Sequence, residues 1–322
     1  MSVMEERAGI GNTPYKPLKS RRRSVWASIK RDRYLYLLGL PGLICLILFK
    51  YVPMWGVIIA FQNYSPFLGF GASEWVGMEH FQRLFANPDF AVLFRNTLAI
   101  NLMGLFLFFP VPIILALMMN EVRQQVFKRV VQSIVYLPHF LSWVIIAGLT
   151  FTMFATGEGL VNKVLEQWGL SRVEWLTTPG YFWAFLTGQS IWKEAGWGTI
   201  IFLAAIAGVD PQQYEAARMD GASRLRQIWH ITLPAIRNVV VILLILRMGN
   251  MMDVGFEQVF LMQNSLVSSV SEVFDTYVYR VGIQQSEFSY STAVGLFKSV
   301  VGLILVMGSN YLAKKFGNEG FF

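Results

Sequence analysis

Ionisable side chains lie within long apolar stretches of the sequence, where a charge is costly and marks a candidate functional site. Seven candidates are Lys50, Lys193, Glu194, Arg247, Asp253, Glu257 and Lys298. No pair of carboxylates has the sequence context of a catalytic acid and base. The histidines, His80, His139 and His230, are far apart, and the single cysteine, Cys45, lies in an apolar run. We therefore predict a binding function, with no catalytic residue and no metal site.

The fourth and fifth apolar stretches combine amide, carboxylate and indole side chains. Sugars are held by hydrogen bonds and by aromatic rings that stack on their apolar faces. The residues that offer this chemistry are Trp192, Glu194, Asn250, Asp253 and Gln258. We predict that they contact a substrate. The alternative for each is a hydrogen bond between helices or a contact with a partner chain.

Long apolar segments must position these residues. The 322 residues are 54% hydrophobic and only 15% charged, whereas charged residues make up about a quarter of a soluble domain. A helix needs roughly 20 apolar residues to cross a membrane. Six segments qualify: 34–61, 93–119, 130–154, 181–209, 238–262 and 292–312. The sequence predicts an all-α polytopic membrane protein with six transmembrane helices, the first of which is disturbed near Lys50 and Pro53.

Basic residues are distributed unevenly around these segments. Nine of them lie in residues 1–33. If this tail is in the cytoplasm, the inner connections hold eighteen Lys and Arg residues and the outer loops hold four. Such an excess inside the cell is the rule for membrane proteins, and it explains the net charge of +7 without nucleic acid. We predict a basic cytoplasmic tail over 1–33 and a transmembrane domain over 34–322, with both termini in the cytoplasm.

The connection between the fourth and fifth segments, about residues 210–236, has the signals of two helices joined by a glycine. Asp210 can cap a helix, and Pro211 suits its first turn. Gly221 allows the left-handed backbone that follows a helix end. A second amphipathic segment follows, and Pro234 marks the start of the next apolar segment. Such a rigid elbow transmits force only if a soluble partner docks on it.

This loop resembles the EAA loop of permeases from binding-protein-dependent ATP-binding-cassette (ABC) importers. That motif is Glu-Ala-Ala, three residues, Gly, nine residues and Ile-x-Leu-Pro. The chain matches it without a change in spacing at Glu215, Ala216, Ala217, Gly221, Ile231, Leu233 and Pro234, and Asp220 is also typical. Residues 61–66 (FQNYSP) and 295–301 (GLFKSVV) resemble the maltose-type carbohydrate branch, and within it the group that serves oligosaccharides and polysaccharide fragments.

The resemblance implies a type I importer permease that moves a sugar, such as an oligosaccharide, across the cell membrane. The EAA loop would form the coupling helix, with Glu215 as the polar contact to an ATPase subunit and Gly221 as the elbow. The implied partners are a second, unlike permease subunit, two cytoplasmic ATPase subunits and an extracellular solute-binding protein. The chain has no GxxxxGK[ST] phosphate loop, so we expect no cofactor here and ATP on a partner.

Three alternatives are open. A permease of the same kind could carry a non-sugar solute. An ion-coupled secondary transporter would show internal inverted repeats; none is evident, and the EAA loop would have no explanation. A membrane-embedded enzyme would need clustered nucleophiles or metal ligands near one interface.

Overall fold

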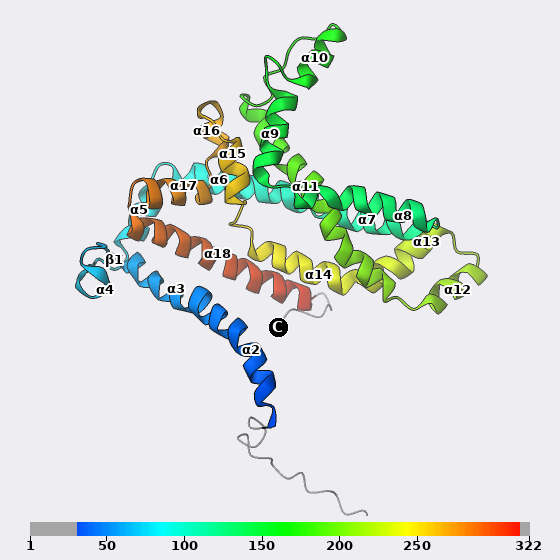
Figure 1. Cartoon of the computed structure of the whole chain (residues 1–322), viewed down its shortest axis with the longest axis horizontal. Coiled ribbons are helices and arrows are strands. Elements are labelled where there is room, and N and C mark those ends of the chain that lie inside the picture. The colour runs from blue at the N-terminus through cyan, green and yellow to red at the C-terminus, as the bar shows by residue number, and fades with distance from the viewer. Residues whose placement is uncertain (1–30, 316–322) are drawn as a thin grey trace, which may run out of the picture. The chain divides into compact units, whose positions relative to one another are not determined.

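The computed structural model describes residues 31–315, and these are largely helical (Figure 1). Contacts within the chain divide it into two units that meet between Gly56 and Val57. The first unit contains one apolar helical stretch: α2 (Arg33–Leu46), the π-helix η1 (Ile47–Tyr51) and α3 (Val52–Met54). The 3-10 helix η2 (Trp55–Phe61) continues it into the second unit. The helix type thus changes around Lys50 and Pro53, where the sequence predicts a kink or an early exit from the membrane. Most of the predicted tail, residues 1–30, is outside the described residues.

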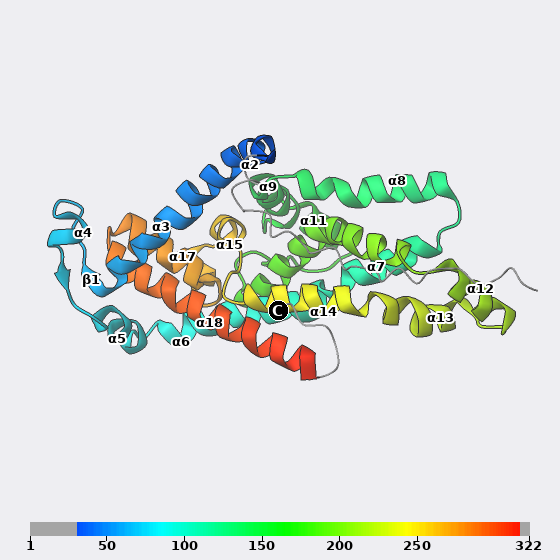
Figure 2. The same cartoon turned by 90° about the horizontal axis from the view of Figure 1, so that it is seen from below.

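The second unit begins with a small antiparallel hairpin. β1 (Gln62–Asn63) pairs with β2 (Glu74–Trp75), with Gln62 opposite Trp75, and α4 (Gly69–Ala72) lies between them. The amphipathic α5 (Glu79–Ala86) follows and buries Phe81 and Leu84. Figures 1 and 2 both place α5 and the hairpin at one end of this unit and α12 (Pro211–Met219) at the other.

The second predicted span is one helical stretch of 32 residues, Phe90–Glu121. It consists of α6 (Phe90–Met103), the π-helix η3 (Gly104–Phe108) and α7 (Pro110–Glu121). The π-helix adds one residue to a turn, which lets Pro110 and Pro112 begin α7 in its first turn, where their missing N–H groups leave no hydrogen bond unmade.

The third predicted span is broken in the middle. α8 (Gln125–Tyr136) and the 3-10 helix η4 (Leu137–Phe140) meet α9 (Trp143–Phe154) at a bend of 100°. Ser142 caps the new helix, because its hydroxyl accepts a hydrogen bond from the Ile145 N–H. The prediction of one continuous helix over 130–154 was therefore wrong: a capping residue restarts the helix within an apolar run.

The fourth predicted span corresponds to α11 (Pro179–Ala207), which follows the short α10 (Leu160–Gln167). Its 29 residues exceed the roughly 20 that a span requires, but α11 is not among the described helices that are both long and apolar enough to cross a membrane. α11 packs against α7, α8 and α14 (Leu233–Gly249). Gly196 makes this possible, since its Cα lies against the backbone of Val135 in α8, where a Cβ atom has no room.

The fifth predicted span ends earlier than expected. A helix of 26 residues runs from Arg224 to Gly249, through α13 (Arg224–Gln227), the π-helix η5 (Ile228–Thr232) and α14. The chain then leaves the helix, and Gly255 has a left-handed φ of 91°. Residues 256–262 form the separate helix α15 (Phe256–Met262). The predicted boundary at 262 was wrong because Asn250 to Gly255, a polar and glycine-containing segment, interrupts the apolar run.

The remaining elements are η6 (Ser265–Val267), α16 (Ser268–Ser271), α17 (Phe274–Tyr279), the π-helix η7 (Arg280–Gln284) and α18 (Phe288–Lys315). α18 contains the sixth predicted span and lies beside α14 (Figures 1 and 2). The two helices approach closely where Gly302 meets the carbonyl of Gly249. Among the described residues, four helices are long and apolar enough to cross a membrane, or five if the bent α8–α9 pair is one span.

A polar cluster ties the end of this unit near α5 together. The Asn87 side chain donates to the hydroxyl of Tyr277 (2.6 Å) and also reaches Tyr290. Burial and the hydrogen bond with Tyr290 raise the pKa of the Tyr277 phenol. Arg83 is paired with Glu287, which raises the pKa of the guanidinium. Both groups therefore keep their protons at neutral pH, and the cluster joins α5, α17 and α18.

Candidate functional site

The predicted elbow is formed by α12, Gly221 and α13. Asp210 caps α12, since its carboxylate accepts from the Gln212 N–H at 2.9 Å. The helix ends with Gly221 at a φ of 72°. The Gly221 N–H donates to the Arg218 carbonyl, and the Ala222 N–H donates to the Ala217 carbonyl at 2.8 Å. This pair of hydrogen bonds is the Schellman ending, in which the left-handed residue is usually glycine.

Beyond the glycine, the second predicted helix is continuous with the fifth span. Ser223 caps α13, and the helix continues through η5 and Pro234 into the span. Pro234 has no N–H to donate and ends no helix here, because it falls in the first turn of α14 after the π-helical turn. The second helix of the elbow, α13, is therefore continuous with an apolar helix long enough to span a membrane, and α12 joins it at the Gly221 turn.

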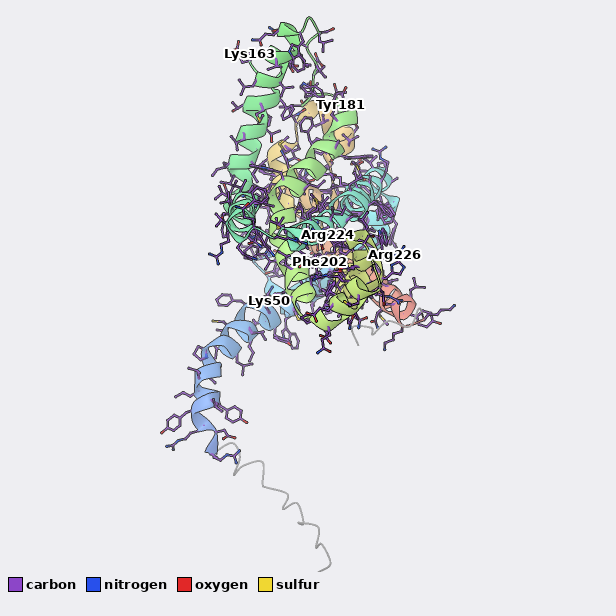
Figure 3. All side chains as sticks on the ribbon, turned by 90° about the vertical axis from the view of Figure 1, so that its right-hand side faces the viewer. Lys50, Lys163, Tyr181, Phe202, Arg224 and Arg226 are labelled. Carbon is purple, nitrogen blue, oxygen red and sulfur yellow. The ribbon has the colours of Figure 1, made fainter. Side chains whose placement is uncertain are left out.

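The elbow presents polar and apolar groups to solvent. Glu215 and Ala216 are exposed, whereas Ala217 is partly buried. Met219 is 88% exposed, and Leu225 and Trp229 also have exposed side chains. Figure 3 views the structure from this side and labels Arg224 and Arg226 on α13. An exposed apolar group next to polar side chains is typical of a protein-docking surface.

Two side-chain hydrogen bonds hold the elbow in shape. The hydroxyls of Tyr214 and Thr232 are 3.0 Å apart and join α12 to η5. The Gln227 amide donates to the Ala222 carbonyl at 2.9 Å. The other motif residues Ile231 and Leu233 are half-buried, while Asp220 and Pro234 are exposed. The loop is thus a braced protrusion at one end of the second unit.

The predicted substrate residues lie in four different environments. Trp192, which is 49% exposed, lines a cavity of about 610 Å³ between α9 and α11. Its other lining side chains are almost all apolar and include Phe154, Trp175 and Phe185. This cavity offers aromatic faces but few hydrogen-bonding groups.

Asn250 and Asp253 share a second cavity, of about 460 Å³, between α14 and α18. Lys298 lies in its wall and binds two carboxylates, Asp253 at 2.7 Å and Asp275. Asp275 also accepts from the Val254 N–H at 3.0 Å. Asp253 is 64% exposed and Asp275 is 17% exposed at the side chain. Asp253 therefore has an oxygen free to meet a ligand, whereas Asp275 is a structural partner of Lys298.

Glu194 belongs to a cluster at the broken span. Its carboxylate lies 2.7 Å from Nδ1 of His139 and 3.6 Å from Nζ of Lys193. Lys193 is only 7% exposed, and its amine donates to the carbonyls of His139 (2.6 Å) and Leu141 (2.7 Å). The His139 ring stacks on Trp197 with centroids 4.4 Å apart. Lys193 thus satisfies the carbonyls that the bend releases.

Gln258 is buried in a hydrogen-bond network between α15 and α11. Its amide donates to the Leu186 carbonyl (2.8 Å) and to the Gln189 side chain (3.0 Å), and its oxygen accepts from Ser190 (3.2 Å). All of these partners lie on α11. Gln258 therefore forms hydrogen bonds between helices, which is the predicted alternative to substrate contact.

Arg247 is a charged residue that the predicted substrate set omits. Its Nε has no hydrogen-bond partner and is buried, and no ion pair joins it to a carboxylate within residues 31–315. The guanidinium lies over the Phe108 ring at 5.7 Å and against Gly104, where a Cβ atom would be 2.5 Å from it. In the sequence, Arg247 could be found as a candidate only because it is a charged residue within an apolar segment, as Lys298 is. No group of three or more His, Cys, Asp or Glu residues that could hold a metal ion occurs in the described part.

The chain was compared with known protein families, curated proteins and solved structures. Residues 108–318 match the family described as binding-protein-dependent transport system inner membrane component. The chain is 56% identical to protein LplB of Bacillus subtilis over 296 residues, which cover 92% of this chain and 93% of that protein. It is 54% identical to the polygalacturonan/rhamnogalacturonan transport system permease protein YteP of Bacillus subtilis over 304 residues, which cover 94% and 95%.

A similar fold is found in a solved structure. A chain of a bacterial alginate ABC transporter, crystallised in complex with an alginate pentasaccharide-bound periplasmic protein, superposes with a TM-score of 0.84. It is 40% identical, and the match covers 92% of this chain and 99% of that chain. The predicted type I permease fold is therefore confirmed, together with the predicted resemblance to carbohydrate permeases.

Proposed function

The chain belongs to the family of binding-protein-dependent transport system inner membrane components, and we propose that it is the permease subunit of an ABC importer that carries oligosaccharides. The observation that carries this proposal is the braced elbow of α12 and Gly221 in a chain with 54% identity to a polysaccharide transport permease over nearly its whole length. Its place is the cell membrane, with both termini in the cytoplasm, as the basic residues indicate.

The elbow is the coupling element in this proposal. Glu215 and the surface of Ala216 and Ala217 contact a cytoplasmic ATPase subunit, and the continuous helix Arg224–Gly249 carries its movement into the membrane. ATP is bound and hydrolysed by two such partner subunits, so the chain itself has no catalytic role and no cofactor. A second permease subunit and an extracellular solute-binding protein complete the importer.

The substrate class we propose is an acidic oligosaccharide, one that contains uronic acid units. Polygalacturonan, named for one relative, and alginate, named for a solved relative, are both acidic polysaccharides. Arg247 supports this class, because a guanidinium at membrane depth without a carboxylate in the described chain can bind a substrate carboxylate through charge-assisted hydrogen bonds. The open carboxylate of Asp253 can bind sugar hydroxyls.

Uptake by the reconstituted importer tests the proposal. The chain, its partner permease and the ATPase subunits are placed in proteoliposomes with the binding protein, and uptake of labelled trigalacturonate is measured. We expect uptake that requires ATP and continues when ion gradients are collapsed. Uptake driven by an ion gradient without ATP would favour a secondary transporter. ATP-dependent uptake of a non-sugar solute alone would leave the importer in place and exclude the sugar.

A further inference from the structure

We propose that a polar cavity on the extracellular side of the membrane binds one ring of the oligosaccharide. The cavity is formed by η6, α16, α17 and η7, and α15 bounds its edge. This inference rests on the proposed function, which supplies the sugar and the orientation. The cavity has a volume of about 350 Å³, within the range of roughly 300–1,000 Å³ of small-molecule sites. Its lining residues belong to the end of α15 and to the long outer loop of the predicted topology, and α15 and α17 lie away from α12 in the second unit (Figures 1 and 2).

The lining of this cavity combines the two kinds of group that bind a sugar ring. Phe260 and Tyr279 supply aromatic surface, with ring centroids 5.3 Å apart and planes at 73°. Phe256 supports both rings at 5.0 Å. Around them are the amides of Gln263 and Gln284 and the hydroxyl of Ser265. By comparison, the cavity of about 610 Å³ near Trp192 is lined mainly by apolar side chains.

Several polar groups in the lining are free to bind a ligand. Among residues 31–315, no hydrogen bond occupies the side chains of Gln263, Gln284 or Ser265, or the Tyr279 hydroxyl. Glu272 and Arg280 form an ion pair in the same wall. Because a guanidinium has five N–H donors, Arg280 keeps donors for a sugar hydroxyl or carboxylate while it holds Glu272.

The cavity is held by hydrogen bonds to neighbouring helices, so that its shape exists before a ligand arrives. The Trp183 indole on α11 donates to the Val270 carbonyl at 2.9 Å. The Asn96 amide on α6 donates to the Glu272 carbonyl at 2.9 Å, and the Asn264 amide donates to the Leu176 carbonyl at 3.1 Å. Preorganised groups lose little conformational entropy on binding. A rigid concavity of this size fits one pyranose ring and leaves no room for a protein segment.

Protection of an introduced cysteine tests the subsite. Cys45 is replaced by Ser in the full chain, and Ser265→Cys is introduced into the cavity. Ser171→Cys is the matched control, because Ser171 is exposed on another outer loop and does not line the cavity. The reconstituted importer, without its binding protein, is treated with a membrane-impermeant maleimide in the presence or absence of trigalacturonate. We expect slower modification at position 265 and an unchanged rate at position 171.

A second variant shows whether the aromatic surface contributes. Tyr279→Ala should raise the trigalacturonate concentration needed for half protection about tenfold, whereas Tyr279→Phe, which keeps the aromatic surface and loses only the hydroxyl, should raise it less. Three outcomes would each overturn the subsite. They are equal protection at both cysteines, no protection at position 265, and protection by the binding protein but not by free saccharide. Uptake by the parent importer is measured in parallel, so that loss of protection with normal uptake rejects the subsite alone, and absence of uptake rejects the proposed function.

Discussion

Lys298 shows how differently two carboxylates on the same amine can behave. The side chain of Asp275 is largely buried and is also bound by a backbone N–H, whereas that of Asp253 is 64% exposed at the cavity. Removing one partner of a buried ion pair leaves an uncompensated charge, which is far more costly than losing an exposed pair. In this group of three residues, the pair of Lys298 with Asp275 is therefore structural, whereas Asp253 is accessible to a ligand.

We predict that Lys298→Met lowers the free energy of unfolding by about 3–5 kcal/mol, because Asp275 loses its cation. Asp253→Asn, the matched control, should change it by less than about 1 kcal/mol. Thermal unfolding of the purified chain in detergent measures both. Adding Asp275→Asn to Lys298→Met should recover part of the loss; equal effects of Lys298→Met and Asp253→Asn would show that the burial of Asp275 is unimportant.

Arg247 gives a prediction about substrate choice. Arg247→Met should reduce ATP-dependent uptake of trigalacturonate about tenfold or more, since a hydrogen bond to a charged group contributes about 1.5–3 kcal/mol. Uptake of any neutral trisaccharide that the importer accepts should change little. Arg247→Lys keeps the charge and should retain much of the uptake. A fall of the same size for acidic and neutral saccharides would instead indicate a structural role.

Among the elements, the elbow is the part in which local conformation matters most. Gly221→Val places a β-branched residue at a φ of 72°, where side chains clash with the backbone. We predict that this variant and Glu215→Lys hydrolyse ATP without importing saccharide, while insertion into the membrane is unchanged. Parallel assays of ATPase activity and uptake in proteoliposomes test this.

The control for the elbow is Gly157→Val on an outer loop. Gly157 has no neighbouring atom within 4 Å of a built Cβ and no left-handed φ, so both activities should be retained. Normal uptake by Gly221→Val and Glu215→Lys would refute the assignment of the elbow as the coupling element.

The elements that the sequence predicted well are those with local signals. Asp210 and Gly221 sit at helix ends and act through neighbours within a few residues. The bend in the third span has a local cap too, Ser142, but Leu141 and the residues after Ser142 continue the apolar run, so the pattern of apolar residues predicted one helix. The amine that binds the released carbonyls belongs to Lys193, about 50 residues later. Similarly, the partners of Gln258 lie on α11, far away in the chain, and no spacing rule reveals them.

At the scale of the whole molecule, the family and the fold followed from one loop and the pattern of apolar segments, whereas the orientation rests on charge. If the chain has the six predicted spans, it ends on the side of the membrane from which it began. We therefore predict that residues 314–315 lie at the cytoplasmic face with the basic tail and that Ser171 lies outside.

Labelling in intact cells tests this topology. In a Cys45→Ser background, Ser171→Cys should react with an impermeant maleimide in intact cells, and Lys315→Cys should react only after the membrane is opened. Both positions fall in the described part of the chain and are exposed. Reaction of Lys315→Cys in intact cells would contradict a cytoplasmic C-terminus.

The π-helix η5 between the elbow and α14 has a consequence for how such chains change over time. A π-helical turn has the form of an α-helix that has gained one residue. Deleting a single residue within Ile228–Thr232 would restore the α-helix and rotate α12 and Gly221 by about 100° around the axis of α14. The surface that we propose to face the ATPase would then point in another direction. Insertions and deletions of one residue in this turn should therefore be selected against, even where substitutions are tolerated. The length of this segment should be retained in related functional chains.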